Sequence, residues 1–94
     1  MDDDNLKQLL EKRAFFIRQS PVAISHASDD RQQVEKLKSK FGGEVLANTK
    51  PNRRFGRWSW NVTGDAARET AMILLPLAEK TSPYMAVFLK KAVG

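Results

Sequence analysis

Residues 50–57 form the most basic stretch of the chain, and their residue types suit contacts to phosphates. The stretch contains Lys50, Arg53, Arg54 and Arg57 and no acidic residue. Lysine and arginine neutralise nucleic-acid phosphates and release the counterions condensed around them. Arginine also recognises guanine through two hydrogen bonds in the major groove. The stretch is therefore a candidate nucleic-acid contact, and a solvated loop tip is the competing interpretation.

The distribution of charge along the chain points the same way. The 94 residues include 16 lysines and arginines against 11 acidic residues, which gives a net charge of +5. Residues 31–60 hold eight of the basic side chains and only two of the acidic ones. Lys36 and Lys40 stand one helical turn apart and stack on one side of an expected helix. Such a cluster indicates a polyanionic partner, with a solubilising surface as the alternative.

Hydrophobic spacing and turn residues predict the elements that position these side chains. Helix 29–41 should begin at Asp29, with Gln32 completing a capping box, and end at Gly42 and Gly43. Pro76 should bend or break the helix that contains it. The expected helices are 5–18, 29–41, 66–79 and 83–92, and the expected strands are 22–27, 44–49 and 56–62.

This order, α-β-α-β-β-α-α, predicts an α+β fold. Its small antiparallel sheet would consist of one β-hairpin plus one further strand, packed on one side by helices. Alternation along the strands separates the two faces of that sheet. Trp58 and Trp60 are expected to face the helices. The opposite face would present donors suited to a nucleic-acid groove, namely Ser25, Arg57, Ser59 and Asn61.

The composition argues against an enzyme, a metal site or a bound cofactor. The chain has no cysteine and a single histidine, His26, which falls on the apolar face of its strand and is expected to be structural. The acidic residues 1–4 are expected to fray, which leaves a single domain over residues 5–94. An acidic start argues against a secretory signal, and no apolar stretch reaches the roughly 18 residues of a membrane helix. We therefore expect a cytoplasmic protein associated with DNA or the nucleoid.

Residues 21–80 resemble the core of LAGLIDADG homing endonuclease domains, particularly the phage and bacterial types. The order of the matching motifs and their spacing carry the resemblance. They are Pro21, Ile24, Asp30-Arg31, Val34, Leu37, Phe41-Gly42-Gly43, Trp58-Ser59-Trp60-Asn61-Val62, Thr63-Gly64, Ala67 and Leu74-Leu75-Pro76-Leu77. In that family the sheet forms a saddle on the major groove of DNA, and helices cover its other face.

The chain departs from the family at the helix that gives the family its name. That helix carries small residues and ends in a metal-binding acid, whereas residues 9–16 are bulky and basic. The first strand of the family sheet also has no counterpart in the expected elements. The resemblance therefore implies a degenerate, non-catalytic domain that binds duplex DNA, with no nuclease activity. It also implies a homodimer on a long site and a role as regulator or accessory factor of a phage or mobile element.

The implied contact residues combine the basic loop, the outward strand face and the lysines of helix 29–41. They are Lys50, Arg53, Arg54, Arg57, Ser59, Asn61, Ser25, Lys36 and Lys40. Two other interpretations stay open. In a winged-helix domain the hairpin would be the wing and Lys36, Lys38 and Lys40 would contact phosphates. In a small inhibitor or adaptor, such as a phage-encoded blocker of a host nucleic-acid enzyme, the partner would be a protein.

Overall fold

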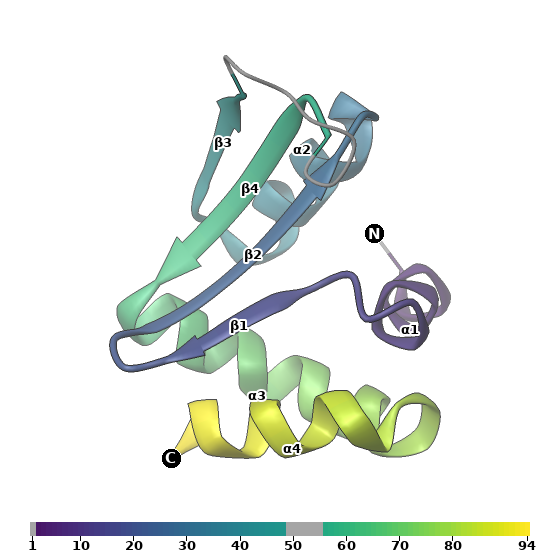
Figure 1. Cartoon of the computed structure of the whole chain (residues 1–94), viewed down its shortest axis with the longest axis vertical. Coiled ribbons are helices and arrows are strands. Elements are labelled where there is room, and N and C mark those ends of the chain that lie inside the picture. The colour runs from purple at the N-terminus through teal and green to yellow at the C-terminus, as the bar shows by residue number, and fades with distance from the viewer. Residues whose placement is uncertain (1, 49–55) are drawn as a thin grey trace.

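The computed structural model describes residues 2–48 and 56–94 and shows the expected α+β fold, with four helices and one antiparallel sheet (Figure 1). The sheet has four strands, one more than the sequence predicts. The elements are α1 (Asp3–Glu11), β1 (Phe16–Gln19), β2 (Val22–Ser28), α2 (Arg31–Phe41), β3 (Glu44–Ala47), β4 (Trp58–Thr63), α3 (Gly64–Thr81) and α4 (Pro83–Val93).

The strands are arranged in the order β1-β2-β4-β3, and every neighbouring pair is antiparallel. The predicted hairpin is confirmed as β3 and β4, and β2 joins it along the other edge of β4. In the view of Figure 1, α2 lies behind β2 and β4, and α4 lies below β1. Within the described residues, the helices therefore leave one face of the sheet without a helical cover.

The predicted helix 5–18 is wrong beyond Glu11, because residues 16–19 form the additional strand β1. Arg13 adopts a left-handed backbone conformation, with φ 55°, that ends the helical path. Its guanidinium group lies 4.0 Å from the centre of the Tyr84 ring on α4. Phe15 is buried, with its ring 6.3 Å from that of Trp60. These contacts with distant residues favour an extended chain, which local helical spacing does not reveal.

Helix α1 begins within the acidic start of the chain. Asp2 caps the helix and accepts a hydrogen bond of 2.9 Å from the Asn5 amide. Asp3 and Asp4 then lie in the first helical turn, where the helix dipole favours negative charge. Asp3 and Asp4 are therefore part of α1.

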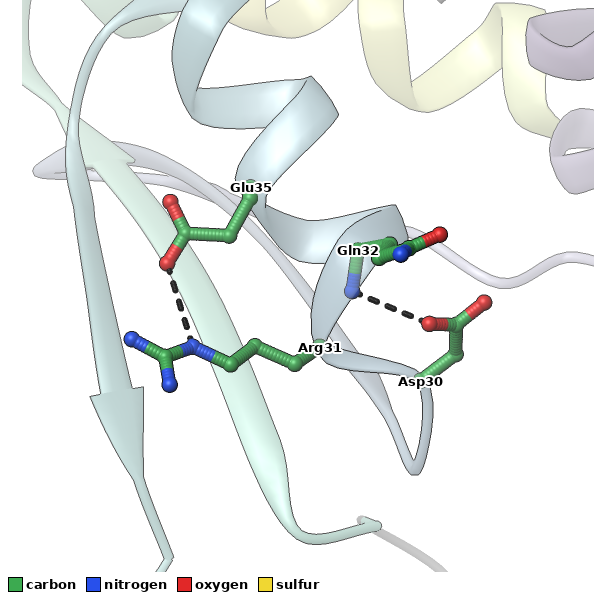
Figure 2. Close-up of polar contacts among 4 residues, drawn as sticks. All are labelled: Asp30, Arg31, Gln32 and Glu35. Atoms are coloured by element: carbon green, nitrogen blue, oxygen red, sulfur yellow. Dashed lines mark hydrogen bonds and ion pairs between the residues drawn. The ribbon is translucent and has the colours of Figure 1, made fainter.

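Helix α2 begins one residue later than predicted. Asp30 is the N-cap and accepts a hydrogen bond of 2.9 Å from the Gln32 amide, so the expected capping box led by Asp29 is wrong (Figure 2). The Asp29 carboxylate instead accepts a hydrogen bond of 3.1 Å from the backbone amide of Arg57. Asp29 thus ties the start of α2 to the start of β4. The predicted stop at Gly42 is confirmed, with Gly42 at φ 79°.

Pro76 neither ends nor breaks its helix, since α3 continues from Gly64 to Thr81. The side chains that anchor α3 in the core include Leu74 and Ala78, both fully buried. Pro76 itself is exposed, as is Met72, whose carbonyl loses its hydrogen-bond donor to the proline. Water can hydrate a carbonyl on the outer side of a helix, so the helix tolerates the proline there.

The core lies between the inner sheet face and the helices, and Trp60 is its largest fully buried side chain. The Trp60 indole N–H donates a hydrogen bond of 2.8 Å to the carbonyl of Gly42, at the end of α2. The Phe41 ring packs 5.9 Å from the Trp60 ring. The prediction that Trp60 faces the helices is therefore confirmed, and Trp58 on the same strand face is half-buried.

Candidate nucleic-acid interface

The face of the sheet opposite Trp60 is polar and partly exposed. The strand register aligns Phe16, Ser25, Asn61 and Glu44 in one row across the sheet. A second row contains Ala27, Ser59 and Leu46, and a third contains Arg18, Ala23 and Thr63. We call these ten residues the open face.

The structure brings three of the predicted contact residues together on the open face. Ser25 and Asn61 are direct neighbours on β2 and β4, and Ser59 lies two residues from Asn61. All three are half-buried, whereas Arg57, immediately before β4, is exposed. The sequence therefore assigned Ser25, Ser59 and Asn61 to the correct side of the sheet.

The Ser59 hydroxyl has a structural partner that the sequence did not indicate. It donates a hydrogen bond of 3.0 Å to the Oδ1 atom of Asn48, and the Asn48 amide nitrogen donates one of 2.9 Å to the carbonyl of Gly56. The backbone amide of Asn48 also donates to the Arg57 carbonyl at 2.8 Å. Ser59 thus helps to hold together the two ends of the loop between β3 and β4. Asn61 is the better candidate for contacts to a base.

The backbone at the start of β4 is held closely against β2. A Cβ atom at Gly56 would lie 2.7 Å from the carbonyl carbon of Ser28, and Gly56 has φ 69°. Both facts require glycine at this position. Together with the hydrogen bond between Asp29 and the Arg57 amide, this contact fixes the position from which the Arg57 side chain departs. Lys50, Arg53 and Arg54, the other predicted contacts of this loop, lie outside the described residues.

Lys36 and Lys40 are not part of the open face. Both are exposed on α2, which packs on the inner side of the sheet through Val34 and Leu37. They line a groove of about 670 Å³ along α2, together with Arg31, Gln32, Glu35 and Ser39. A single flat ligand surface cannot contact this groove and the open face at once.

Arg31 in the α2 groove has contacts that restrict its use for a ligand. Its Nε atom lies 3.5 Å from a Glu35 carboxylate oxygen, in an exposed pair one helical turn apart (Figure 2). Its guanidinium carbon lies 4.9 Å from the centre of the Trp58 ring. Arg31 therefore covers the half-buried Trp58 and pairs with Glu35, and the other cations among the described residues of the groove are Lys36 and Lys40.

Sequence reasoning missed the contribution of β1 to the open face. Arg18 and Phe16 project from β1 on the same side as Ser25 and Asn61, and Phe16 is 56% exposed. Residues 16–19, Phe-Ile-Arg-Gln, do not alternate between apolar and polar, so the available signal was their position directly before the turn at Ser20 and Pro21. It was obscured because the same residues also fit the helical spacing of the preceding segment.

His26 lies on the inner face, as predicted, and is 5% exposed. Its Nδ1 atom lies 2.9 Å from the Ala14 carbonyl, and its Nε2 atom contacts the side-chain amide nitrogen of Gln33 on α2. Burial lowers the pKa of His26, and the hydrogen bond to the Ala14 carbonyl opposes this in part. The residue joins the segment before β1 to α2 and has no route to the open face.

Within residues 2–48 and 56–94, no group of three or more histidine, aspartate or glutamate side chains is placed to hold a metal ion. No helix in the same part of the chain is long and apolar enough to cross a membrane.

Comparison with known proteins gives no further guide to the site. No protein family, curated protein or solved structure matches this chain. The functional argument therefore depends on the geometry and chemistry of the open face.

Proposed function

We propose that this protein is a non-catalytic DNA-binding protein that places the open face of its sheet against duplex DNA. The observation that carries the proposal is the composition of that face. It has no helical cover within the described residues, and it presents the Asn61 amide and the Ser25 hydroxyl between Arg18 and Arg57. Amide groups read base edges, and arginines contact phosphates or guanine.

The dimensions of the face support this orientation. Arg57 precedes β4, and Arg18 lies in the row of Thr63, at the other end of β4. Six residues of extended chain separate positions 57 and 63, a length of about 20 Å. The major groove is about 12 Å wide. The two arginines would therefore lie near the phosphates that border the groove, while Asn61 lies between them.

Basic residues in the sequence between β3 and β4, and one acidic residue of the open face, also bear on DNA binding. Lys50, Arg53 and Arg54 lie in the sequence between β3 and β4, shortly before Arg57, and add three positive charges to this part of the sequence. Glu44 stands beside Asn61 and disfavours a phosphate at that edge. Glutamate can accept a hydrogen bond from cytosine, so Glu44 is compatible with a base contact.

The resemblance to homing endonuclease domains agrees with this proposal. It implies a sheet that binds DNA with helices on its other face, and a strand before residues 22–28, where β1 lies. Under the same proposal, the protein acts as a regulator or accessory factor of a phage or mobile element, and a homodimer would cover a longer site.

The test is selection from a pool of random duplex DNA at near-physiological salt, followed by sequencing. Arg18→Glu/Arg57→Glu removes the arginine of the open face and the arginine immediately before β4, and Arg53→Glu/Arg54→Glu removes two arginines of the sequence between β3 and β4. Arg68→Glu/Lys80→Glu is the matched control, because both residues are exposed on α3 and the change in net charge is the same. We expect a discrete motif for the wild type and the control, and its loss in both test variants.

A salt series then separates specific binding from the general effect of a +5 protein. Each phosphate contact makes the slope of log K against log salt concentration more negative by about 0.9. The substitutions at Arg18 and Arg57 should make the slope less negative by about 2, and the control should leave it nearly unchanged. The same loss of slope in control and test variants, with no enriched motif, would contradict the proposal.

The α2 groove supports a second candidate, in which phosphates bind Lys36 and Lys40 as in the winged-helix interpretation. Lys36→Glu/Lys40→Glu should then abolish DNA binding while Arg18→Glu/Arg57→Glu retains it. A protein partner is the third candidate, supported by the exposed apolar side chains Phe16 and Leu46 on the open face. Absence of DNA binding in all forms, including the wild type, would favour this candidate.

A further inference from the structure

The open face is hollowed because its central strand carries small side chains. On this face β2 presents Ala23, Ser25 and Ala27. Their cross-strand neighbours on β1 and β4 are mostly larger, and neighbouring side chains on one sheet face stand side by side. Small residues between larger ones leave a depression. A hollow of about 360 Å³ lies near the start of β2, close to the turn that connects β1 to β2.

The hollow combines an aromatic wall, a polar rim and a small floor. Phe16 stands at one side, in the row of Ser25 and Asn61, and Arg18 stands in the next row. Ala23 occupies the position between Arg18 and Thr63, where its methyl group leaves the most space. The residues that line the hollow are Phe16, Ile17, Arg18, Ala23, Ser25, Asn61 and Thr63.

Each of these groups matches one part of a nucleotide. A planar base stacks on an aromatic ring, and its edge accepts and donates hydrogen bonds. An asparagine amide pairs with two atoms of an adenine edge, and hydroxyl groups pair with any base. A guanidinium group binds phosphate. The hollow's volume also lies within the range of about 300 to 1,000 Å³ that is usual for small-ligand sites.

A base inside a duplex cannot enter this hollow, because both of its faces are stacked on its neighbours. From these contacts we infer that the hollow binds an unpaired nucleobase of the DNA that lies on the open face. The base stacks against Phe16, its edge bonds to Asn61 and Ser25, and its phosphate pairs with Arg18. This inference rests on the proposed DNA binding and names the form of DNA that the protein prefers.

The experiment compares three probes at near-physiological salt. The first is a duplex with one unpaired 2-aminopurine, the second is the same duplex fully paired, and the third is the 2-aminopurine strand alone. We expect the duplex with the unpaired base to bind about tenfold more tightly than the paired duplex, which corresponds to about 1.4 kcal/mol. Stacking on Phe16 should also quench the 2-aminopurine fluorescence of this probe on binding.

Two variants test the hollow, and each has a matched control on the same face. Phe16→Leu removes the aromatic ring, and Leu46→Ala alters an apolar side chain that is 54% exposed at the other edge. Ala23→Val fills the hollow, and Ala27→Val adds the same group to the same strand outside it. Both test variants should lose the tenfold preference, measured in each variant as the ratio of its affinities for the two duplexes, and both controls should retain this ratio. Thermal unfolding monitors the fold of each variant.

The outcomes separate this inference from the proposed function. Equal affinity of the wild type for the paired duplex and the duplex with an unpaired base would overturn the inference and leave duplex binding intact. A preference that persists in both Phe16→Leu and Ala23→Val would overturn the assignment of the base to the hollow. Absence of binding to all three probes would overturn the proposed function as well.

Discussion

The stability of this protein should depend on pH through one buried side chain, His26. The Ala14 carbonyl can only accept a hydrogen bond, so the His26 Nδ1 atom carries a proton. The Nε2 atom of the neutral ring then accepts a hydrogen bond from the Gln33 amide. Protonation would place a second N–H group at Nε2, opposite the Gln33 donor. The buried site is therefore built for the neutral imidazole.

The sign of the effect follows from the direction of the pKa shift. Burial lowers the pKa of His26 in the folded protein below its ordinary value of 6.5. In the unfolded chain, histidine titrates with a pKa of about 6.5. Above that pH both states are neutral, so the stability from this residue is fully present. Below it the unfolded chain binds the proton first, and the free energy of unfolding falls until the pH reaches the folded pKa.

The slope in this window is at most about 1.4 kcal/mol per pH unit, because a single proton is involved. His26 is the only histidine in the chain, and carboxylates titrate mainly below pH 5. A slope between pH 7 and pH 5 therefore reports on this residue. Urea unfolding, followed by tryptophan fluorescence, gives the free energy at each pH. An NMR titration of the imidazole gives the folded pKa directly.

Two variants make the reasoning refutable. His26→Gln should be less stable than the wild type, with a free energy of unfolding that is nearly constant from pH 7 to pH 5. Gln33→Glu places a carboxylate beside Nε2, which should raise the pKa of His26 above 6.5 and reverse the slope. A wild-type stability that is constant across this window, or a folded His26 pKa of 6.5 or higher, would refute the argument.

Two further predictions concern backbone positions. In urea unfolding, Gly43→Ala should destabilise the protein by at least about 1 kcal/mol more than Gly42→Ala. Both glycines have positive φ, but only at Gly43 would a Cβ atom overlap the Asn61 carbonyl oxygen. Equal costs would show that this close approach has no energetic effect. Asp30→Ala should lower the free energy of unfolding by about 1 kcal/mol and speed hydrogen exchange of the Gln32 amide. Asp29→Ala should instead speed exchange of the Arg57 amide and leave the Gln32 amide protected. Faster exchange at Gln32 in both variants would refute the separate roles of the two aspartates.

Much of the site was predictable because strand alternation is a local property. The order Trp58-Ser59-Trp60-Asn61 assigns alternate residues to opposite faces wherever the strand lies. The register confirms that assignment and adds which residues of β2 stand beside them. The role of Ser59 was not predictable, because its partner Asn48 lies just beyond the end of β3 and their contact depends on the hairpin register.

By itself, the sequence determined the fold class, the hairpin β3–β4, the end of α2 at Phe41, the start of α4 at Pro83 and the inward position of Trp60. Each of these features depends on spacing or turn chemistry among near neighbours. Tertiary structure alone decided that residues 16–19 form a strand, because this segment pairs with β2 while Phe15, just before it, packs against Trp60, which is distant in the sequence. Only the tertiary structure shows that Lys36 and Lys40 on α2 lie away from the open face, because the sequence does not indicate on which side of the sheet α2 packs. The hollow at Ala23 likewise exists only where small and large side chains from three strands meet.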